Sequence, residues 1–135
     1  MSKTSVTQPA VFLHSVVSAR LLAEKGMAPT IVAGHSLGEY SALVTAGVLD
    51  LSAALRLVRR RGELMQEAGT VRPGAMAAIL GVDDAKLVSL CAADAGVVVA
   101  ANFNAPGQIV ISGEAEAVAR VGTAASEAGA KRVID

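Results

Sequence analysis

Aromatic residues and cysteine are almost absent from this sequence. Its 135 residues include two Phe, one Tyr, no Trp and one Cys. So few aromatic rings argue against a platform on which bases or sugars stack. A single Cys excludes an internal disulfide framework and a thiolate metal cluster, and two His without an HExxH spacing argue against a zinc site. We therefore expect no metal and no cofactor.

An excess of charge and a long apolar run are also missing. Lys+Arg and Asp+Glu both number 12, which argues against a nucleic-acid partner. No stretch approaches the roughly 20 apolar residues of a membrane span, and the first ten residues lack the apolar run of a signal peptide. Because 53% of the residues are hydrophobic, the chain is predicted to fold. We expect it in the cytoplasm, without a membrane partner.

The first half of the chain predicts three helices and one strand. The helices end near Gly26, Gly47 and Ala68, and an apolar β-branched strand is expected at 30–33. A strand that is apolar on both faces needs neighbouring strands, and residues 1–69 supply none. We therefore interpret 1–69 as part of a larger α/β layer whose other strands lie outside this chain.

The second half, residues 70–135, has a different pattern. It predicts elements in the order β-α-β-β-α-β, with the ranges 74–80, 83–95, 97–101, 108–112, 114–128 and 131–134. This order is typical of the ferredoxin-like split βαβ unit, in which two helices cover one face of a four-stranded sheet. The fold class expected for the whole chain is thus α/β.

The segment Gly34-His35-Ser36-Leu37-Gly38 fits the G-x-S-x-G pattern of a nucleophile elbow, between a predicted strand and a predicted helix. In that context the turn lifts the serine hydroxyl clear of the sheet. Side chains at positions 34 and 38 would crowd each other, so both positions are expected to need glycine. Ser36 is the predicted nucleophile, and the backbone N–H of Leu37 is the predicted oxyanion donor. The alternative is a glycine-rich turn with an incidental serine.

A hydroxyl is a weak nucleophile without a positioned base, and the sequence shows none for Ser36. His35 is its direct neighbour, so the two side chains diverge. His14 lies in the middle of a predicted helix. Either the base lies outside this sequence or the chain alone does no covalent chemistry.

Arg61 breaks the amphipathic pattern of the helix that begins near Ser52. At about 100° per residue, one face of this helix carries Ala54, Leu57, Val58, Leu64, Met65 and Ala68. Arg61 falls near the centre of that apolar face, with no local acid to pair with it. Burying an unpaired guanidinium is costly. Arg61 is therefore expected to bind a ligand anion, to pair with a structural carboxylate from another segment, or to extend its side chain to the solvent. An acyl substrate with its own carboxylate, such as a malonyl thioester, fits an arginine near an activated serine.

Five blocks of the sequence resemble one bacterial enzyme family. They are TQPA at 7–10, AGHSLGEYSAL at 33–43, RG at 61–62 with MQ at 65–66, GAMAA at 74–78 and NFNAPGQ at 102–108. Together they resemble bacterial malonyl-CoA:acyl-carrier-protein transacylases over essentially the whole chain. The block at 33–43 also occurs in polyketide-synthase acyltransferase domains.

The resemblance implies an activity and the residues that perform it. Ser36 would take the malonyl group from malonyl-CoA and pass it to the phosphopantetheine thiol of acyl carrier protein, in fatty acid biosynthesis. Arg61 would bind the malonyl carboxylate, Leu37 would supply a backbone oxyanion donor, and Asn104 would border the pocket. Malonyl-CoA and acyl carrier protein are the implied partners.

The resemblance also implies a division of the chain. Residues 1–69 would be part of a large hydrolase-like subdomain, and residues 70–135 would form a small ferredoxin-like subdomain. The family's N-terminal Gly-Gln-Gly segment and its catalytic histidine have no counterpart in this sequence. We therefore expect a fragment that is inactive alone and that has the missing parts of its own fold as a partner.

Three other interpretations stay open from the sequence. A polyketide-synthase acyltransferase fragment shares the block around Ser36. A serine hydrolase would share only the elbow, and it has no use for a cation on an apolar helix face. The ferredoxin-like half could instead serve as a non-catalytic protein-binding module, which detection of an acyl adduct on Ser36 would contradict.

Overall fold

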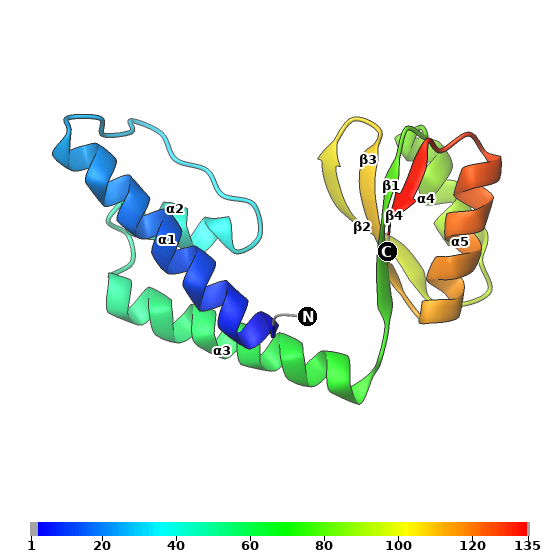
Figure 1. Ribbon diagram of the computed structural model, residues 1–135, viewed down its shortest axis with the longest axis horizontal. Coiled ribbons are helices and arrows are strands. Elements are labelled where there is room, and N and C mark those ends of the chain that lie inside the picture. The colour runs from blue at the N-terminus through cyan, green and yellow to red at the C-terminus, as the bar shows by residue number, and fades with distance from the viewer. Residues whose placement is uncertain (1–2, 135) are drawn as a thin grey trace. The chain divides into compact units, whose positions relative to one another are not determined.

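The computed structural model describes residues 3–134 of the chain. Two compact units follow one another along the sequence, Met1–Val71 and Arg72–Asp135. Figure 1 shows their helices and strands, coloured along the chain. Within the described part, no helix has the length and apolar character needed to cross a membrane. Each unit has a hydrophobic core of its own.

The first unit consists of helices. They are α1 (Thr4–Glu24), α2 (Gly38–Thr45) and α3 (Leu51–Val71). α1 lies against α3 (Figure 1), and their core contains Phe12 and Val16 from α1 with Ala54 and Val58 from α3. These residues recur every four positions on each helix, so each helix turns one apolar line toward the other.

A glycine lets the two long helices approach closely. A Cβ atom at Gly62 of α3 would lie 3.0 Å from the Cα atom of Ser5 and 3.1 Å from the backbone oxygen of Thr4, in the first turn of α1. Since both of these are backbone atoms, a larger side chain at position 62 would push the helices apart. The approach brings the start of α1 to the middle of α3.

The strand predicted at 30–33 does not form. These residues belong to the irregular segment between α1 and α2, and Ile31 is 87% exposed. No strand is present in the first unit as far as it is described, from residue 3 to residue 71. A strand forms only where its backbone N–H and C=O groups can hydrogen-bond to a neighbouring strand, and residues 3–71 contain none. The three predicted helices are confirmed, and the prediction of the strand is wrong.

As far as it is described, to residue 134, the second unit combines four strands with two helices. In chain order they are β1 (Ala75–Leu80), α4 (Asp84–Ala93), β2 (Val98–Ala105), β3 (Gln108–Gly113), α5 (Ala115–Glu127) and β4 (Arg132–Ile134). The strands lie in the order β2-β3-β1-β4, and each neighbouring pair is antiparallel. This is the predicted order of elements, and the chain as a whole is a mixed α/β protein.

One face of the sheet carries the core of the second unit. Ile79 of β1 pairs with Ile109 of β3, and both side chains are fully buried. α4 and α5 cover this face (Figure 1) and contribute Leu87 and Val121. Because side chains alternate along a strand, Met76 of β1 lies on the opposite face and is 52% exposed.

A pair of charged side chains joins the end of α4 to α5. Oδ1 of Asp94 accepts hydrogen bonds from Nη2 of Arg120 at 2.6 Å and from the backbone N–H of Gly96 at 2.8 Å. Oδ2 of Asp94 accepts a third from Nε of Arg120 at 2.9 Å. These bonds, those from Arg120 above all, lower the pKa of Asp94 to about 2. The pair therefore stabilises this part of the unit with an ionised carboxylate.

Candidate active site

Ser36 lies in a strained turn directly before α2. Its φ angle is 55°, and no other non-glycine residue among residues 3–134 has a positive φ angle. The backbone N–H of Gly38 donates to the carbonyl of His35 at 3.0 Å, and that of Glu39 donates to the carbonyl of Ser36 at 3.3 Å. The Ser36 side chain is exposed. The strained turn expected of a nucleophile elbow is therefore present, and it presents the hydroxyl to solvent.

The two glycines of the motif have different roles. A Cβ atom at Gly34 would lie 2.2 Å from the backbone carbon and oxygen of Gly38, closer than any side chain tolerates. A Cβ atom at Gly38 would meet nothing within 4 Å. The expectation that both positions need glycine is thus wrong for position 38. The crowding is one-sided because the space beside Gly34 is filled by the backbone of Gly38, not by a side chain at that position.

Leu37 combines a packed side chain with an unused backbone donor. Its side chain is half-buried and packs against the core of the first unit. Its N–H donates no hydrogen bond within the described residues, and it lies at the N-terminus of α2. A fixed N–H at a helix N-terminus can stabilise negative charge that develops on a reacting carbonyl oxygen.

Arg61 of α3 reaches the elbow. Its Nη2 donates to Oγ of Ser36 at 2.9 Å, and its Nη1 donates to Oε1 of Gln8 at 2.5 Å. Its side chain is half-buried, and none of the ion pairs formed by residues 3–134 includes it. The guanidinium therefore has neutral hydrogen-bond partners, and no carboxylate among residues 3–134 pairs with it.

The helix face around Arg61 is less buried than predicted. Three of its apolar residues are between 47% and 51% exposed, namely Leu57, Leu64 and Met65. Burial is confined to the line of α3 that contains Ala54, Val58 and Gly62. α1 packs on this line, so the remainder of the apolar face stays open in the first unit. Arg61 lies beside the buried line, with its guanidinium at the edge of the packed region.

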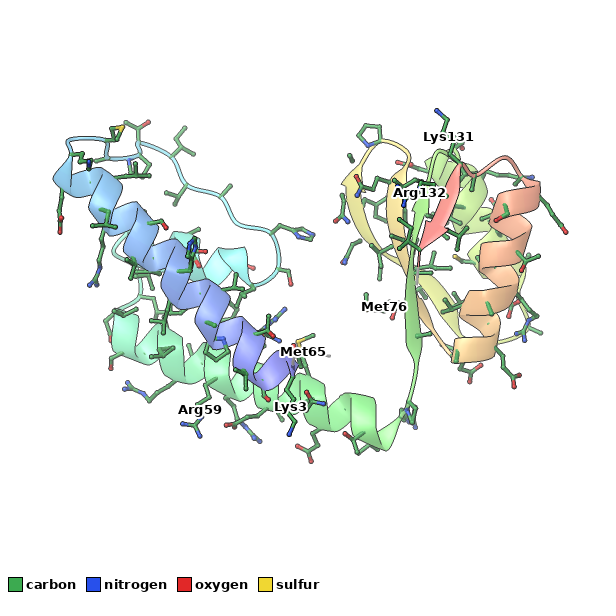
Figure 2. All side chains as sticks on the ribbon, viewed as in Figure 1. Lys3, Arg59, Met65, Met76, Lys131 and Arg132 are labelled. Atoms are coloured by element: carbon green, nitrogen blue, oxygen red, sulfur yellow. The ribbon has the colours of Figure 1, made fainter. Side chains whose placement is uncertain are left out.

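Gln8 is a member of this site that the sequence analysis missed. Its side chain is only 6% exposed, although it is polar. Its Oε1 accepts from Arg61, and its Nε2 donates to Oγ1 of Thr4 at 3.0 Å and to Sδ of Met65 at 3.2 Å. Met65 is labelled on α3 in Figure 2. The signal was available, because Gln8 shares a four-residue spacing with the buried Phe12 and Val16. A polar residue on a buried line is the same anomaly as Arg61.

Asn104 and two histidines are the other candidate residues. Asn104 is exposed on β2 of the second unit. His14 and His35 are both exposed, and within the described residues neither makes a hydrogen bond to the hydroxyl of Ser36. In residues 3–134, no group of three or more His, Cys, Asp or Glu side chains could hold a metal ion. Ser36, Arg61 and Gln8 are thus the side chains that the structure connects.

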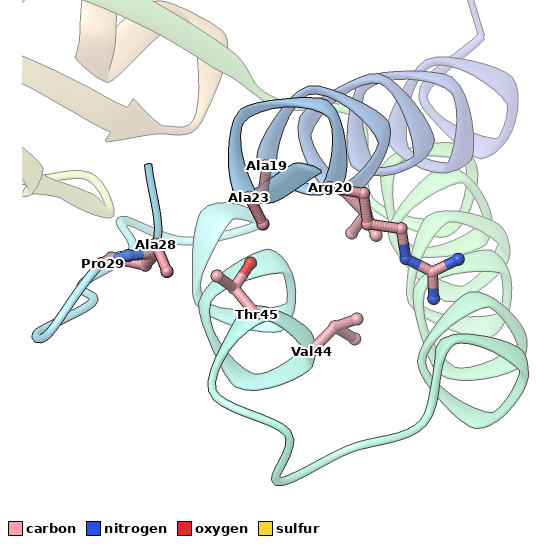
Figure 3. Close-up of a pocket in the computed structure, with 8 residues that line it drawn as sticks. Ala19, Arg20, Ala23, Ala28, Pro29, Val44 and Thr45 are labelled. Atoms are coloured by element: carbon pink, nitrogen blue, oxygen red, sulfur yellow. The ribbon is translucent and has the colours of Figure 1, made fainter. Parts of the chain in front are cut away.

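A separate pocket of about 220 Å³ lies elsewhere in the first unit. Figure 3 shows its lining, which includes Ala19 and Ala23 of α1, Pro29 of the following segment and Thr45 of α2. None of the residues at the elbow lines it. No acidic side chain lines the pocket, and the hydroxyl of Thr45 donates to the backbone oxygen of Ser41 at 2.8 Å. The pocket is therefore distinct in composition from the candidate active site.

Comparison with known proteins assigns the chain to one class, the acyl transferase domains. Residues 1–135 match the acyl transferase domain, and the chain belongs to that family. It is 53% identical over 137 residues to the malonyl CoA-acyl carrier protein transacylase of Escherichia coli K12, covering 99% of this chain and 44% of that protein. The chain therefore spans less than half the length of the curated relatives that it matches.

Solved structures give the same result. The malonyl CoA-acyl carrier protein transacylase of Coxiella burnetii is 46% identical, with a TM-score of 0.92 over 98% of this chain and 43% of that one. A complex of a type II PKS acyl-carrier protein with its malonyl-transacylase matches with 52% identity and a TM-score of 0.90, over 98% of this chain and 44% of that one. The first unit and the second both lie within these matches.

Proposed function

We propose that this chain is part of an acyl-carrier-protein S-malonyltransferase, which moves a malonyl group from malonyl-CoA to the phosphopantetheine thiol of acyl carrier protein in fatty acid biosynthesis. The observation that carries the proposal is the 2.9 Å contact between Nη2 of Arg61 and Oγ of Ser36. An uncompensated cation beside a nucleophile suits an acyl substrate with its own carboxylate. Membership of the acyl transferase domain family and the activity of the E. coli relative support the same function.

The reaction consists of two acyl transfers through Ser36. In the first, Oγ bonds to the thioester carbonyl carbon, the carbon–sulfur bond breaks, and CoA leaves with the proton that the hydroxyl loses. In the second, the carrier-protein thiol attacks the malonyl-serine ester and Oγ leaves, regaining a proton from that thiol. Among residues 3–134, neither His14 nor His35 makes a hydrogen bond to the Ser36 hydroxyl, so neither is positioned as the base that relays these protons.

Arg61 is positioned to hold the malonyl carboxylate while Ser36 attacks. A single methylene separates the carboxylate from the thioester carbonyl, so a cation adjacent to Oγ is at the right distance along the substrate. A guanidinium has five N–H donors, and two are engaged by Ser36 and Gln8. Three donors remain, which suffice for a bidentate carboxylate.

Two further residues complete the proposed site. The N–H of Leu37 supplies one oxyanion donor. Two observations support this role: the N–H donates no hydrogen bond within the described residues, and it lies at the start of α2. Asn104 borders the malonyl pocket. The support for Asn104 is the resemblance of residues 102–108 to the transacylase family, together with the exposure of its side chain on β2.

We extend the proposal to the architecture. Residues 1–69 belong to a large hydrolase-like subdomain, which the elbow turn before α2 supports. Residues 70–135 form a small ferredoxin-like subdomain, which the strand order β2-β3-β1-β4 and the two helices on one face support. A cytoplasmic location stays a prediction.

A polyketide-synthase acyltransferase is the second candidate function. The 52% identity to the malonyl-transacylase seen with a type II PKS acyl-carrier protein favours it. Both candidates use the same chemistry and differ in the carrier protein that accepts the malonyl group. A serine hydrolase is disfavoured because hydrolysis of a simple ester gives Arg61 no role.

The test uses an enzyme of full family length, made by grafting this chain in place of the matching segment of the E. coli transacylase. This grafted enzyme is incubated with radiolabelled malonyl-CoA, and label is measured on the protein and on two carrier proteins, one from fatty acid and one from polyketide synthesis. Ser36→Ala should abolish label on the enzyme, whereas the control Ser89→Ala, an exposed serine of α4, should retain it. Label that persists in Ser36→Ala would contradict the proposed nucleophile.

Arg61→Ala tests the substrate class in the same grafted enzyme. We expect kcat/KM for malonyl-CoA to fall about 100-fold or more, because a charge-assisted bidentate contact is lost. The slow transfer of acetyl groups, which carry no carboxylate, should change far less. Equal losses for both acyl groups would show that Arg61 does not recognise the carboxylate.

A further inference from the structure

We infer that Gln8 is a positioning residue that fixes the Arg61 guanidinium for a carboxylate while leaving its positive charge uncompensated. The inference rests on the proposed function, since it concerns how that site selects its substrate. It assigns a role in acyl-group selection to a helix-buried amide that lies 53 residues from Arg61 in the sequence. Gln8 does not touch the reacting atoms, so its effect passes through Arg61.

The hydrogen bonds define the orientation of the Gln8 amide. Oε1 accepts from Nη1 of Arg61, and Nε2 donates to Oγ1 of Thr4 and Sδ of Met65. The reversed amide would point its NH₂ group at a guanidinium, which has donors and no acceptor. Only one orientation satisfies all three partners, so the amide presents a fixed oxygen to Arg61.

The surroundings of Gln8 hold that oxygen still. The side chain is 6% exposed, and its helix is drawn against α3 at Gly62, the residue after Arg61. Thr4 lies one helical turn before Gln8 and Met65 one turn after Arg61, so the two anchors come from both helices. A flexible arginine side chain loses much of its rotamer freedom when one of its nitrogens is bound to so rigid a partner.

The neutrality of Gln8 matters as much as its geometry. A carboxylate at this position would form an ion pair with Arg61 and compete with the carboxylate of the substrate. A glutamine supplies the same acceptor oxygen without the charge. Nη1 is held by Gln8 and Nη2 lies beside Ser36, so the guanidinium is fixed next to the nucleophile with its charge available.

The test compares Gln8→Leu and Gln8→Glu in the grafted enzyme, with His14→Ala, an exposed side chain on the same helix, as the control. We expect Gln8→Leu to raise KM for malonyl-CoA about tenfold, because a hydrogen bond to a charged group is lost, and to change kcat and acetyl transfer little. Gln8→Glu should lose more malonyl transfer than Gln8→Leu, although it is closer in shape to glutamine. Equal loss of malonyl and acetyl transfer in Gln8→Leu, or malonyl transfer by Gln8→Glu at the unsubstituted rate, would overturn the inference.

A second measurement needs no turnover. In the ¹⁵N-labelled 135-residue chain, hydrogen exchange of the Arg61 guanidinium should be slow and should become fast in Gln8→Leu, with no change in His14→Ala. Unchanged exchange in Gln8→Leu would show that Gln8 does not hold Arg61. The two proposals fail separately: a grafted enzyme whose malonyl transfer is insensitive to Arg61→Ala contradicts the proposed function, whereas sensitivity to Arg61→Ala without sensitivity at Gln8 contradicts only the positioning role.

Discussion

The two units of this chain differ in how completely they bury their apolar side chains. Among the described residues, the core of the second unit contains twelve buried hydrophobic residues, and that of the first contains four. α1 alone exposes six large hydrophobic residues, namely Val6, Val11, Leu13, Val17, Leu21 and Leu22. A sheet with two helices on one face closes a core by itself, whereas three helices packed along narrow lines do not.

The proposed chemistry lies in the less closed unit. Ser36, Arg61 and Gln8 all belong to the first unit, and the strained turn at Ser36 depends on a close backbone approach at Gly34. The second unit contains the four-stranded sheet and, in the proposal, Asn104 as a residue of the site. The first unit thus contains the proposed reacting groups, and the second contains most of the buried hydrophobic residues.

The largest expected effect is that of Gly34→Ala on activity. The new Cβ atom would require the backbone of Gly38 to move, because only 2.2 Å is available. We expect malonyl transfer by the grafted enzyme to fall about 100-fold or more, since displacement of a nucleophile by about 1 Å has effects of that size. Gly69→Ala is the control, because a Cβ atom at that helical position meets nothing within 4 Å. Full activity of Gly34→Ala would contradict the close approach at the elbow.

The second effect is a difference in amide hydrogen exchange between the units of the 135-residue chain. Amides of β1 and β3 should exchange about tenfold or more slowly than those of α1 and α2, because local opening of the first unit exposes less additional apolar surface. Mass spectrometry of peptides from each unit provides the measurement. Equal protection in both units would show that the smaller core is as stable as the larger.

The third effect is that of Ile79→Ala on stability. Truncation of this fully buried side chain should lower the free energy of unfolding of the second unit by about 2–5 kcal/mol, measured by urea denaturation. Met76→Ala on the same strand, where the side chain is half exposed, should cost less than about 1 kcal/mol. Because the two cores share no residue, exchange protection in α1 and α3 should not change with Ile79→Ala. Loss of protection there would show that the units unfold together.

The smallest effect is that of acid on the Asp94–Arg120 pair. The pKa of Asp94 is lowered to about 2 in the folded chain, so its contribution is present above the ordinary pKa of an aspartate and is lost as the pH falls toward 2. The melting temperature of the second unit should therefore drop between about pH 5 and pH 2 less steeply in Asp94→Asn than in the unsubstituted chain. Glu127→Gln, an exposed carboxyl on α5, serves as the control. Because Arg120 is half exposed, the difference in slope between the two proteins should be small. Identical pH profiles of the melting temperature would contradict a stabilising role of the Asp94–Arg120 pair.

Much of the second unit was predictable because its signals are local. Short apolar runs predict β1 and β3, and the order of elements follows from where glycines interrupt the pattern. The motif around Ser36 and the misplaced charge of Arg61 were visible for the same reason. In the first unit, the segment 30–33 has the composition of a strand, yet a strand exists only with a partner to hydrogen-bond, and residues 3–71 provide none.

The sequence by itself determined the helices, the order of the sheet elements, the serine turn and the presence of an arginine with no local acid. These depend on periodicity and on residues near one another in the chain. Only the tertiary structure decided that Gln8 holds Arg61, that Arg61 reaches Ser36, and that Gly34 rather than Gly38 makes room for the turn. Such contacts depend on the distance between backbone segments that are far apart in the chain. No single stretch of the sequence determines that distance.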